Sequence, residues 1–166
     1  FYLMMYNEAL PMPARPELPD LEEGVIRGGY CLEAAVGEGP RINLLGSGTI
    51  LFEVIEAASR LREEGFAVAV YSITSYIELA RDAEQAADSK VASWVSRLFH
   101  EPNVPTVAAS DYVRTLPRMI ASWLPGPLMA LGTDGFGMSE RREALRAHFR
   151  IDAHAIADTA RAMVND

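Results

Sequence analysis

The chain has 166 residues, a length that fits one domain with a sizeable core. Its content of 49% hydrophobic and 23% charged residues, with a mean hydropathy of +0.04, is ordinary for a globular protein. The apolar runs are much shorter than the roughly 20 residues that span a bilayer, so we expect no membrane partner. The net charge of −8 repels phosphate backbones and argues against nucleic-acid binding.

Cys31 is the only cysteine, so it can form neither an internal disulfide nor, by itself, a thiolate metal site. This suits a reducing compartment, and we expect a cytoplasmic location. The chain starts with Phe-Tyr-Leu-Met-Met-Tyr, which lacks an initiator methionine, a basic flank and a small-residue cleavage site. We expect residues 1–6 to form a strand whose sheet lies elsewhere, and we interpret the chain as part of a longer polypeptide.

The next segment is rich in proline. They stand at positions 11, 13, 16 and 19 among acidic residues. Because proline fixes φ and removes a backbone donor, residues 8–23 are predicted to be an extended linker. We therefore divide the chain into residues 1–23, the end of a preceding domain with its linker, and residues 24–166, one α/β domain.

Strand and helix patterns alternate along residues 24–166. Strands are expected over residues 25–35 (at an edge), 42–45, 66–73, 106–109 and 128–131. Helices are expected from 50 to a stop at 65, over 76–87, 91–99 and 111–123, and after caps at Ser139 and Asp152, where Ile151 and Ile156 fit a hydrophobic staple. Repeated strand–helix units predict an α/β fold with three layers, in which helices cover both faces of a mostly parallel sheet.

In such sheets, ligands bind outside the carboxyl ends of the strands. Four loops should lie there: Gly46–Thr49, Ser72–Tyr76, Ser110-Asp111 and Gly132–Gly137. These small, polar loops could hold an anion on helix N-termini, but strand-to-helix turns also need caps and glycines for purely structural reasons. Gly46-Ser47-Gly48 matches neither a dinucleotide fingerprint nor a P-loop, which argues against a nucleotide site.

No set of residues has the spacing of a catalytic or metal centre. The three histidines, at positions 100, 148 and 154, are not clustered with carboxylates, so we expect no metal ligands. Nucleophile-elbow motifs are absent, and Cys31 has no obvious base beside it. Glu78 and Asp82 form a like-charge pair four residues apart that Arg81 can relieve, which indicates a solvated or interface-facing ion cluster.

Four collinear segments resemble a known family. The most specific is Leu131-Gly-Thr-Asp-Gly-Phe-Gly-Met-Ser-Glu-Arg-Arg-Glu-Ala-Leu-Arg-Ala-His-Phe-Arg-Ile-Asp152. The others are Val70–Asp82, Leu44–Leu51 and Glu23–Glu33, and Met5–Glu8 looks like the end of the family's preceding domain. Together they resemble the C-terminal region of the homodimeric, bacterial-type decarboxylating component of the pyruvate dehydrogenase complex, within the transketolase-like thiamine diphosphate superfamily.

The resemblance implies a role for a larger enzyme. That enzyme would decarboxylate pyruvate on thiamine diphosphate with magnesium, then acetylate the lipoyl group of an acyltransferase partner. In this family the cofactor motifs lie in earlier domains, so the resemblance implies no catalytic, cofactor-binding or metal residue here and no cofactor bound by this chain alone. Its expected partners are the upstream thiamine-binding domains, a second subunit of a homodimer and the lipoyl acyltransferase.

Contacts with those partners are assigned to two places. In the loop 133–139, Thr133, Asp134, Phe136 and Ser139 are candidate inter-domain or dimer contacts, because glycine-flanked Phe136 is an odd residue to leave in water; a plain turn with unusual φ angles at Gly135 and Gly137 is the alternative. Glu78 and Asp82 are the second pair of candidates.

The chain also departs from the family pattern. Residues 83–93 are shorter than in the family and lack its Trp, His and Pro. This leaves two alternatives open: a stand-alone interaction or regulatory module, or a split transketolase-like subunit without its own catalysis.

Overall fold

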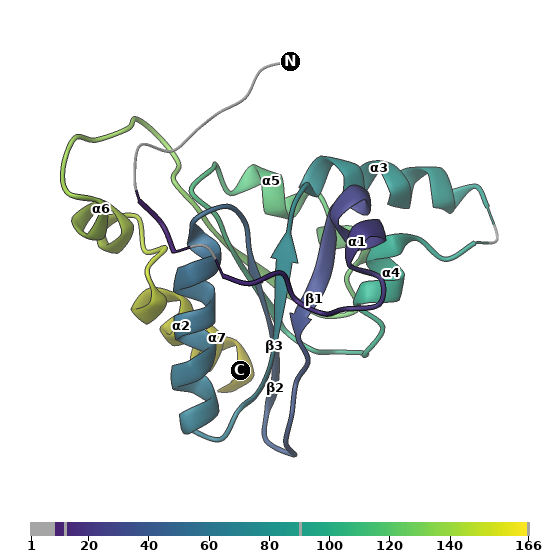
Figure 1. The fold of residues 1–166 in the computed structure, drawn as a ribbon, viewed down its shortest axis with the longest axis horizontal. Helices are drawn as coiled ribbons and strands as arrows, with labels where there is room; N and C mark the ends of the chain where they lie inside the picture. The colour runs from purple at the N-terminus through teal and green to yellow at the C-terminus, as the bar shows by residue number, and fades with distance from the viewer. Residues whose placement is uncertain (1–8, 12, 90, 166) are drawn as a thin grey trace.

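The computed structural model describes residues 9–11, 13–89 and 91–165. The strand expected over residues 1–6 lies outside this part of the chain. The described strands are β1 (Gly29–Glu33), β2 (Arg41–Gly46), β3 (Ala67–Ile73), β4 (Thr106–Ala109) and β5 (Leu128–Leu131). They form one sheet in the order β1-β3-β2-β4-β5, in which β1 is antiparallel to β3 and all other pairs are parallel (Figure 1). The mostly parallel sheet and the edge position of a first strand are confirmed.

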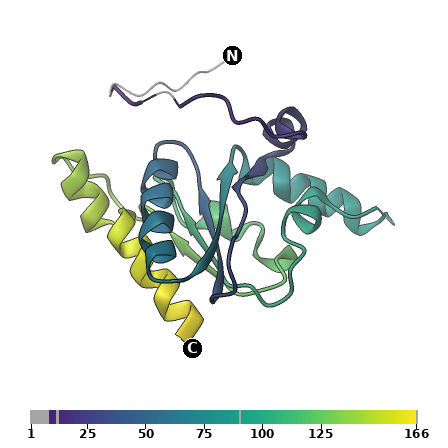
Figure 2. The ribbon, with the colours of Figure 1, turned by 60° about the horizontal axis from the view of Figure 1, so that its bottom comes forward.

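Helices cover both faces of this sheet. α2 (Ile50–Glu63) and α7 (Ala153–Asn165) lie on one face, and α1 (Leu21–Arg27), α3 (Tyr76–Ala87) and α4 (Trp94–Leu98) lie on the other (Figure 2). β3 is buried at all seven positions, as its continuous apolar run predicts. The three-layer α/β architecture is therefore confirmed.

Each helical layer has its own core. Under α2 and α7, the core contains Ile42, Leu44, Val54, Leu61, Val107 and Ile156. Under α3 and α4, it contains Leu45, Tyr71, Leu79, Trp94, Phe99 and Ile120. Alternate residues of β2 point to opposite faces, which is why Leu44 and Leu45 contribute to different cores.

The N-terminal part of the domain differs from the prediction. The helix α1 begins at Leu21, inside the expected linker, and continues through residues expected to start a strand, which itself spans only Gly29–Glu33. Leu21 is buried, and Gly28 ends the helix in the left-handed conformation with φ of 103°. A Cβ at Gly28 would lie 2.4 Å from the carbonyl oxygen of Ser75, so this position requires glycine. The division into residues 1–23 and 24–166 itself stays a prediction.

Three helices are shorter or start later than predicted. The helix expected over 91–99 is α4, which begins after Ser93, whose hydroxyl accepts a hydrogen bond from the Ser96 N–H. The helix expected over 111–123 is broken into α5 (Thr115–Arg118) and a 3-10 turn, Ala121–Trp123. The cap predicted at Ser139 is wrong. α6 (Arg142–His148) begins later, with Arg141 at its N-cap and no capping side chain, because residues 132–141 continue as an extended loop.

The final helix begins as predicted. Asp152 accepts a hydrogen bond from the Ala155 N–H at 2.9 Å, which confirms it as the N-cap of α7. Ile151 and Ile156, on either side of this cap, are buried in the same core. A second carboxylate, Glu53 of α2, accepts the Ala153 N–H at 2.9 Å. Two acidic groups thus satisfy the first turn of α7.

Candidate contact surface

The loops that follow β2, β4 and β5 are joined by hydrogen bonds at the carboxyl edge of the sheet. Ser47 Oγ lies 3.0 Å from Ser110 Oγ, and the Ser110 N–H donates to the carbonyl of Leu131 at 3.2 Å. Ser110 Oγ also accepts the Tyr112 N–H at 3.1 Å. The sequence predicted that these loops could hold an anion, and in the structure their hydroxyl groups hold the loops together.

Thr133 and Asp134 attach the last loop to the one before it. Thr133 Oγ1 donates to the carbonyl of Asp111 at 2.6 Å, and its N–H donates to the carbonyl of Tyr112 at 2.9 Å. Asp134 accepts the Arg114 N–H at 2.9 Å and the Arg114 Nε–H at 2.7 Å. These two bonds, the backbone one first, lower the pKa of Asp134. Both residues therefore have a clear role within the domain.

Beyond Asp134 the chain leaves the body of the domain. Every residue from Asp134 to Ala144 is exposed, including Ser139. Phe136 is 97% exposed and Met138 is 55% exposed. Of the two flanking glycines, only Gly135 has an unusual φ, of 90°. The plain-turn explanation accounts for Gly135, but it does not account for an aromatic ring that is almost fully exposed.

A pocket of about 300 Å³ lies between this loop, α6 and the start of α2. Its walls include Phe136, Met138, Leu145 and Phe149, together with Arg142 and Arg146. Arg146 pairs with Glu53 at 3.1 Å, and both side chains are largely buried. Because Glu53 also accepts the Ala153 N–H, this one carboxylate links α2, α6 and α7. The walls of this surface pocket are therefore apolar and positively charged.

Glu78 and Asp82 lie at the other end of the same edge, on α3. Asp82 accepts hydrogen bonds from Arg27 Nη1 at 2.9 Å and from the Trp94 N–H at 2.5 Å, and so connects α1, α3 and α4. Glu78 pairs with Arg81 at 2.7 Å, as the sequence predicts for a like-charge pair that needs relief. Asp82 has a structural role, whereas Glu78 faces the solvent.

A groove of about 560 Å³ runs between α1 and α3 beside these carboxylates. It is lined by Glu23, Ile26, Arg27, Glu78, Arg81, Asp82 and Gln85. The exposed apolar side chains Val25, Ile26 and Ile77 lie on the same two helices. We call this the α1–α3 groove.

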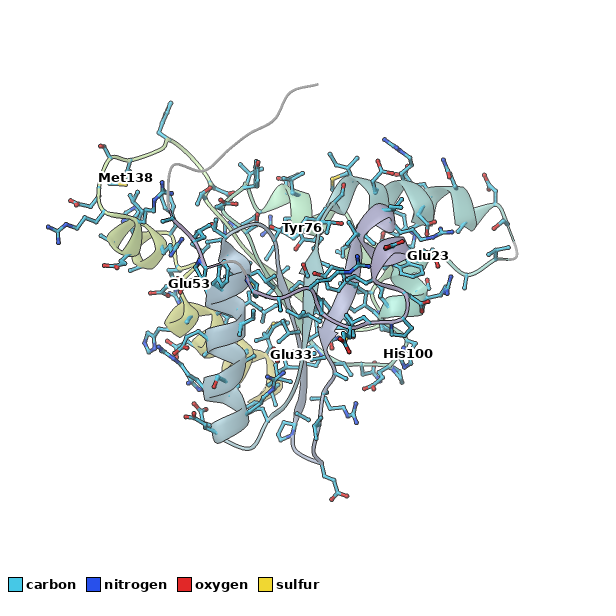
Figure 3. All side chains as sticks on the ribbon, in the orientation of Figure 1. Glu23, Glu33, Glu53, Tyr76, His100 and Met138 are labelled. Atoms are coloured by element: carbon cyan, nitrogen blue, oxygen red, sulfur yellow. The ribbon has the colours of Figure 1, made fainter. Side chains whose placement is uncertain are left out.

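Most of the exposed large apolar side chains gather along this edge of the sheet. The helices α1 and α3 carry Val25, Ile26 and Ile77, of which Ile26 lines the α1–α3 groove. The β4–α5 connection has Tyr112 and Val113, and the β5–α6 loop has Phe136 and Met138. Figure 3 labels Met138 and Glu23 at the two ends. Exposed apolar groups that cluster in this way are typical of protein–protein contact surfaces. Of these residues, only Phe136 was identified from the sequence. The signal that was missed is the presence of apolar residues on the solvent-facing sides of α1 and α3.

The described residues do not assemble a reactive centre. No group of three or more His, Cys, Asp or Glu residues among them could hold a metal ion. Burial raises the pKa of the Cys31 thiol, which keeps it protonated. The Tyr76 hydroxyl, labelled in Figure 3, is fully buried without a hydrogen-bond partner in this part of the chain, and burial raises its pKa as well. Within residues 9–11, 13–89 and 91–165, no helix has the length and apolarity needed to cross a membrane.

The sheet order, the antiparallel edge strand and the helices on both faces define a transketolase-type C-terminal domain. The model of the transketolase-like TK C-terminal domain family matches residues 28–152, and the chain belongs to this family.

Within the family, the chain is similar to one group of enzymes in particular. It is 38% identical to the pyruvate dehydrogenase E1 component of Corynebacterium glutamicum over 94% of its own length, but it spans only 18% of that protein. The fold matches transketolase from Leishmania mexicana, with a TM-score of 0.62 at 22% identity over 86% of this chain and 19% of that one. It also matches a split gene transketolase described as an inactive beta4 tetramer, with a TM-score of 0.55 at 19% identity over 82% of this chain and 42% of that one.

Proposed function

We propose that this chain is the C-terminal assembly domain of a cytoplasmic, thiamine diphosphate-dependent pyruvate dehydrogenase component. The observation that carries the proposal is the carboxyl edge of the sheet, where ligand-binding residues would be expected and exposed apolar side chains are found instead. The similarity to a pyruvate dehydrogenase component of which this chain spans 18% supports the same interpretation.

In this proposal the chemistry belongs to upstream domains. They would hold thiamine diphosphate and magnesium, which supply the carbon–carbon bond cleavage in pyruvate, and the acetyl group would pass to the lipoyl group of the acyltransferase partner. We assign no catalytic residue to this chain. Its contribution is a contact surface on which those domains or the second subunit pack.

The candidate contact residues have different parts in that surface. Phe136 and Ser139 are exposed and would contact the partner directly, as would Glu78. Thr133 and Asp134 would act indirectly, because their hydrogen bonds to the β4–α5 connection set the direction in which the loop leaves the domain. Asp82 would act in the same indirect way on the α1–α3 groove.

Reconstitution tests this function. The upstream domains of the Corynebacterium glutamicum relative, expressed without their own C-terminal region, would be mixed with this chain, and release of carbon dioxide from pyruvate would be measured with thiamine diphosphate and magnesium. We expect activity in the mixture and none from this chain alone. Activity of the isolated chain, or its tight binding of thiamine diphosphate by calorimetry, would overturn the proposal.

A split transketolase-like subunit is the second candidate. The fold match to a split gene transketolase favours it, since that protein shows the fold in a separately encoded chain. A stand-alone interaction or regulatory module is the related alternative. The reading frame upstream of Phe1 discriminates among them: coding sequence continuous with cofactor-binding domains supports the main proposal, and a start codon near Phe1 supports the alternatives.

A further inference from the structure

We infer that a pocket at the amino-terminal end of the parallel strands binds a small, planar, uncharged molecule with an amide or lactam group, which the carboxamide of Asn43 holds. The pocket has a volume of about 280 Å³ and is lined by the first residues of β2 and β3 and by the segment that follows α4. Figure 3 labels His100, which lines this pocket, at the end of the sheet away from Met138. The site is thus separate from the candidate contact surface, and the inference goes beyond the proposed assembly role and does not depend on it.

Asn43 is a polar residue in an apolar part of the fold. It lies in the central strand β2, is only 8% exposed, and has its side chain on the same face of the sheet as Leu45, where α3 and α4 pack. The carboxamide donates one long hydrogen bond, of 3.5 Å, to Thr106 Oγ1 and makes no other within the described residues. Buried amide groups are normally paired, because each unmet donor or acceptor costs free energy. Since Asn43 also lines the pocket, its unused polar groups point to a ligand.

Small neighbours leave space beside this carboxamide. The register of the sheet places Ala69 of β3 next to Asn43, and Ala67 is the preceding residue on the same face of that strand. The rings of Tyr71 and Phe99, with centroids 4.6 Å apart, line the same pocket. A largely apolar pocket with a few polar groups is the usual form of a small-molecule site, and aromatic walls favour a flat ring.

The charged side chains of the pocket lie at its rim. Arg41 Nη1 donates to both carboxylate oxygens of Glu101, at 2.7 and 2.6 Å, and each of these side chains is nearly half exposed. Arg97 and His100 are also exposed. Further in, burial raises the pKa of the Cys31 thiol, which stays protonated. Because a charged group that enters this interior would lose its water without gaining a counter-charge, the structure favours an uncharged ligand.

An amide or a lactam is the group that matches a carboxamide. Each presents an N–H donor beside a C=O acceptor, as the side chain of Asn43 does, so the two can form a pair of hydrogen bonds. Nicotinamide and the nucleobase uracil share this chemistry and differ in that the first carries a primary amide and the second a lactam. The pocket volume of about 280 Å³ is near the lower limit for small-molecule sites, which suits a molecule of this size.

A titration followed by NMR tests the site. Proton–nitrogen correlation spectra of the 166-residue chain would be recorded with nicotinamide and, separately, with uracil. We expect saturable shifts of the Asn43 side-chain amide and of the Ala69 and Phe99 backbone amides, with a dissociation constant of roughly 1 mM or below for at least one probe. The probe that binds more tightly tells a primary amide from a lactam. Nicotinate and dimethyluracil, which lack the amide N–H, should bind about tenfold more weakly or less. Binding of neither nicotinamide nor uracil, or tighter binding of nicotinate, would overturn the inference.

Two variants separate binding from folding. Asn43→Leu keeps a similar volume without the amide and should raise the dissociation constant about tenfold or more, while the thermal unfolding temperature stays level or rises, because the lost amide has only one long hydrogen bond. Ala69→Val retains the amide, narrows the pocket and should weaken binding as well. Gln85→Leu removes an exposed amide on α3 and is the matched control, with no change expected. Unchanged binding in both pocket variants, or a fall in unfolding temperature for Asn43→Leu as large as that for Ile156→Ala, would assign the carboxamide to the fold and overturn the inference.

Discussion

Two neighbouring segments near the end of the chain differ completely in burial. In α7, Ile156, Ala157 and Ala160 are 0% exposed against the sheet and α2. The segment from Asp134 to Ala144 has no buried residue, and α6 has none either. Both helices carry apolar residues at helical spacing, so composition does not separate them. The sheet offers α7 a face to cover, and it offers α6 none, which is why the segment after Asp152 is buried and the segment before it is exposed.

The largest expected effect is on the α7 side of this comparison. Ile156→Ala removes a fully buried side chain and should lower the free energy of unfolding by about 2–5 kcal/mol, measured by urea denaturation. Ile156→Val is the control, with a loss of about 0.5–1.5 kcal/mol. A loss below about 1 kcal/mol for the alanine variant would show that α7 does not pack as described.

A smaller effect is expected at the junction of the two segments. Asp152→Ala removes the side-chain acceptor of the Ala155 N–H and should cost about 1 kcal/mol in the same assay. Asp152→Ser retains an acceptor oxygen and should keep most of the stability. Equal losses for both variants would assign the effect to charge and not to capping.

The loop should respond to pH through Asp134. Hydrogen bonds from Arg114 lower the pKa of this carboxyl, so their stabilising contribution is present above the ordinary pKa of about 3.9 and is lost as the pH falls through the lower, native value. An NMR titration of the Asp134 carboxyl carbon and the Arg114 amide should show both signals changing together below the ordinary range. Asp134→Asn should abolish the transition at Arg114. A transition at the ordinary pKa would mean that the two residues do not pair in solution.

The smallest effect on stability is expected at the loop tip. Phe136→Ala removes a side chain that is 97% exposed, so the free energy of unfolding should change by less than about 0.5 kcal/mol. The same variant should lower the activity that is recovered with the upstream domains in the reconstitution assay. If it instead destabilised the monomer by more than about 1 kcal/mol, the ring would have to pack against its own domain, and the contrast between the segments would fail.

Much of the fold could be predicted because its signals are local. The buried run 66–73 and the cap at Asp152 are readable from a few adjacent residues, and both are confirmed. The cap at Ser139 is wrong because a serine before a helical pattern says nothing about how far the loop extends. The start of α1 was missed because the burial of Leu21 depends on contacts with distant segments.

The candidate surface was only partly predictable. Phe136 stood out because glycines flank it, whereas the apolar positions Ile26 and Ile77 look like ordinary helix residues until the orientation of each helix is known. Asp82 was grouped with Glu78 as a candidate contact. Its hydrogen bonds to Arg27 and Trp94, each far away in sequence, give it a structural role that sequence spacing does not reveal.

By itself, the sequence determined the class of fold and the family resemblance, because period, turn chemistry and motifs are encoded over short stretches. Only the tertiary structure decided which apolar side chains remain exposed to water. It also decided that they lie along one edge of the sheet, with arginine side chains at one end and carboxylates at the other. Burial depends on how the layers pack, since a similar amphipathic pattern is buried in α7 and is not buried in α6.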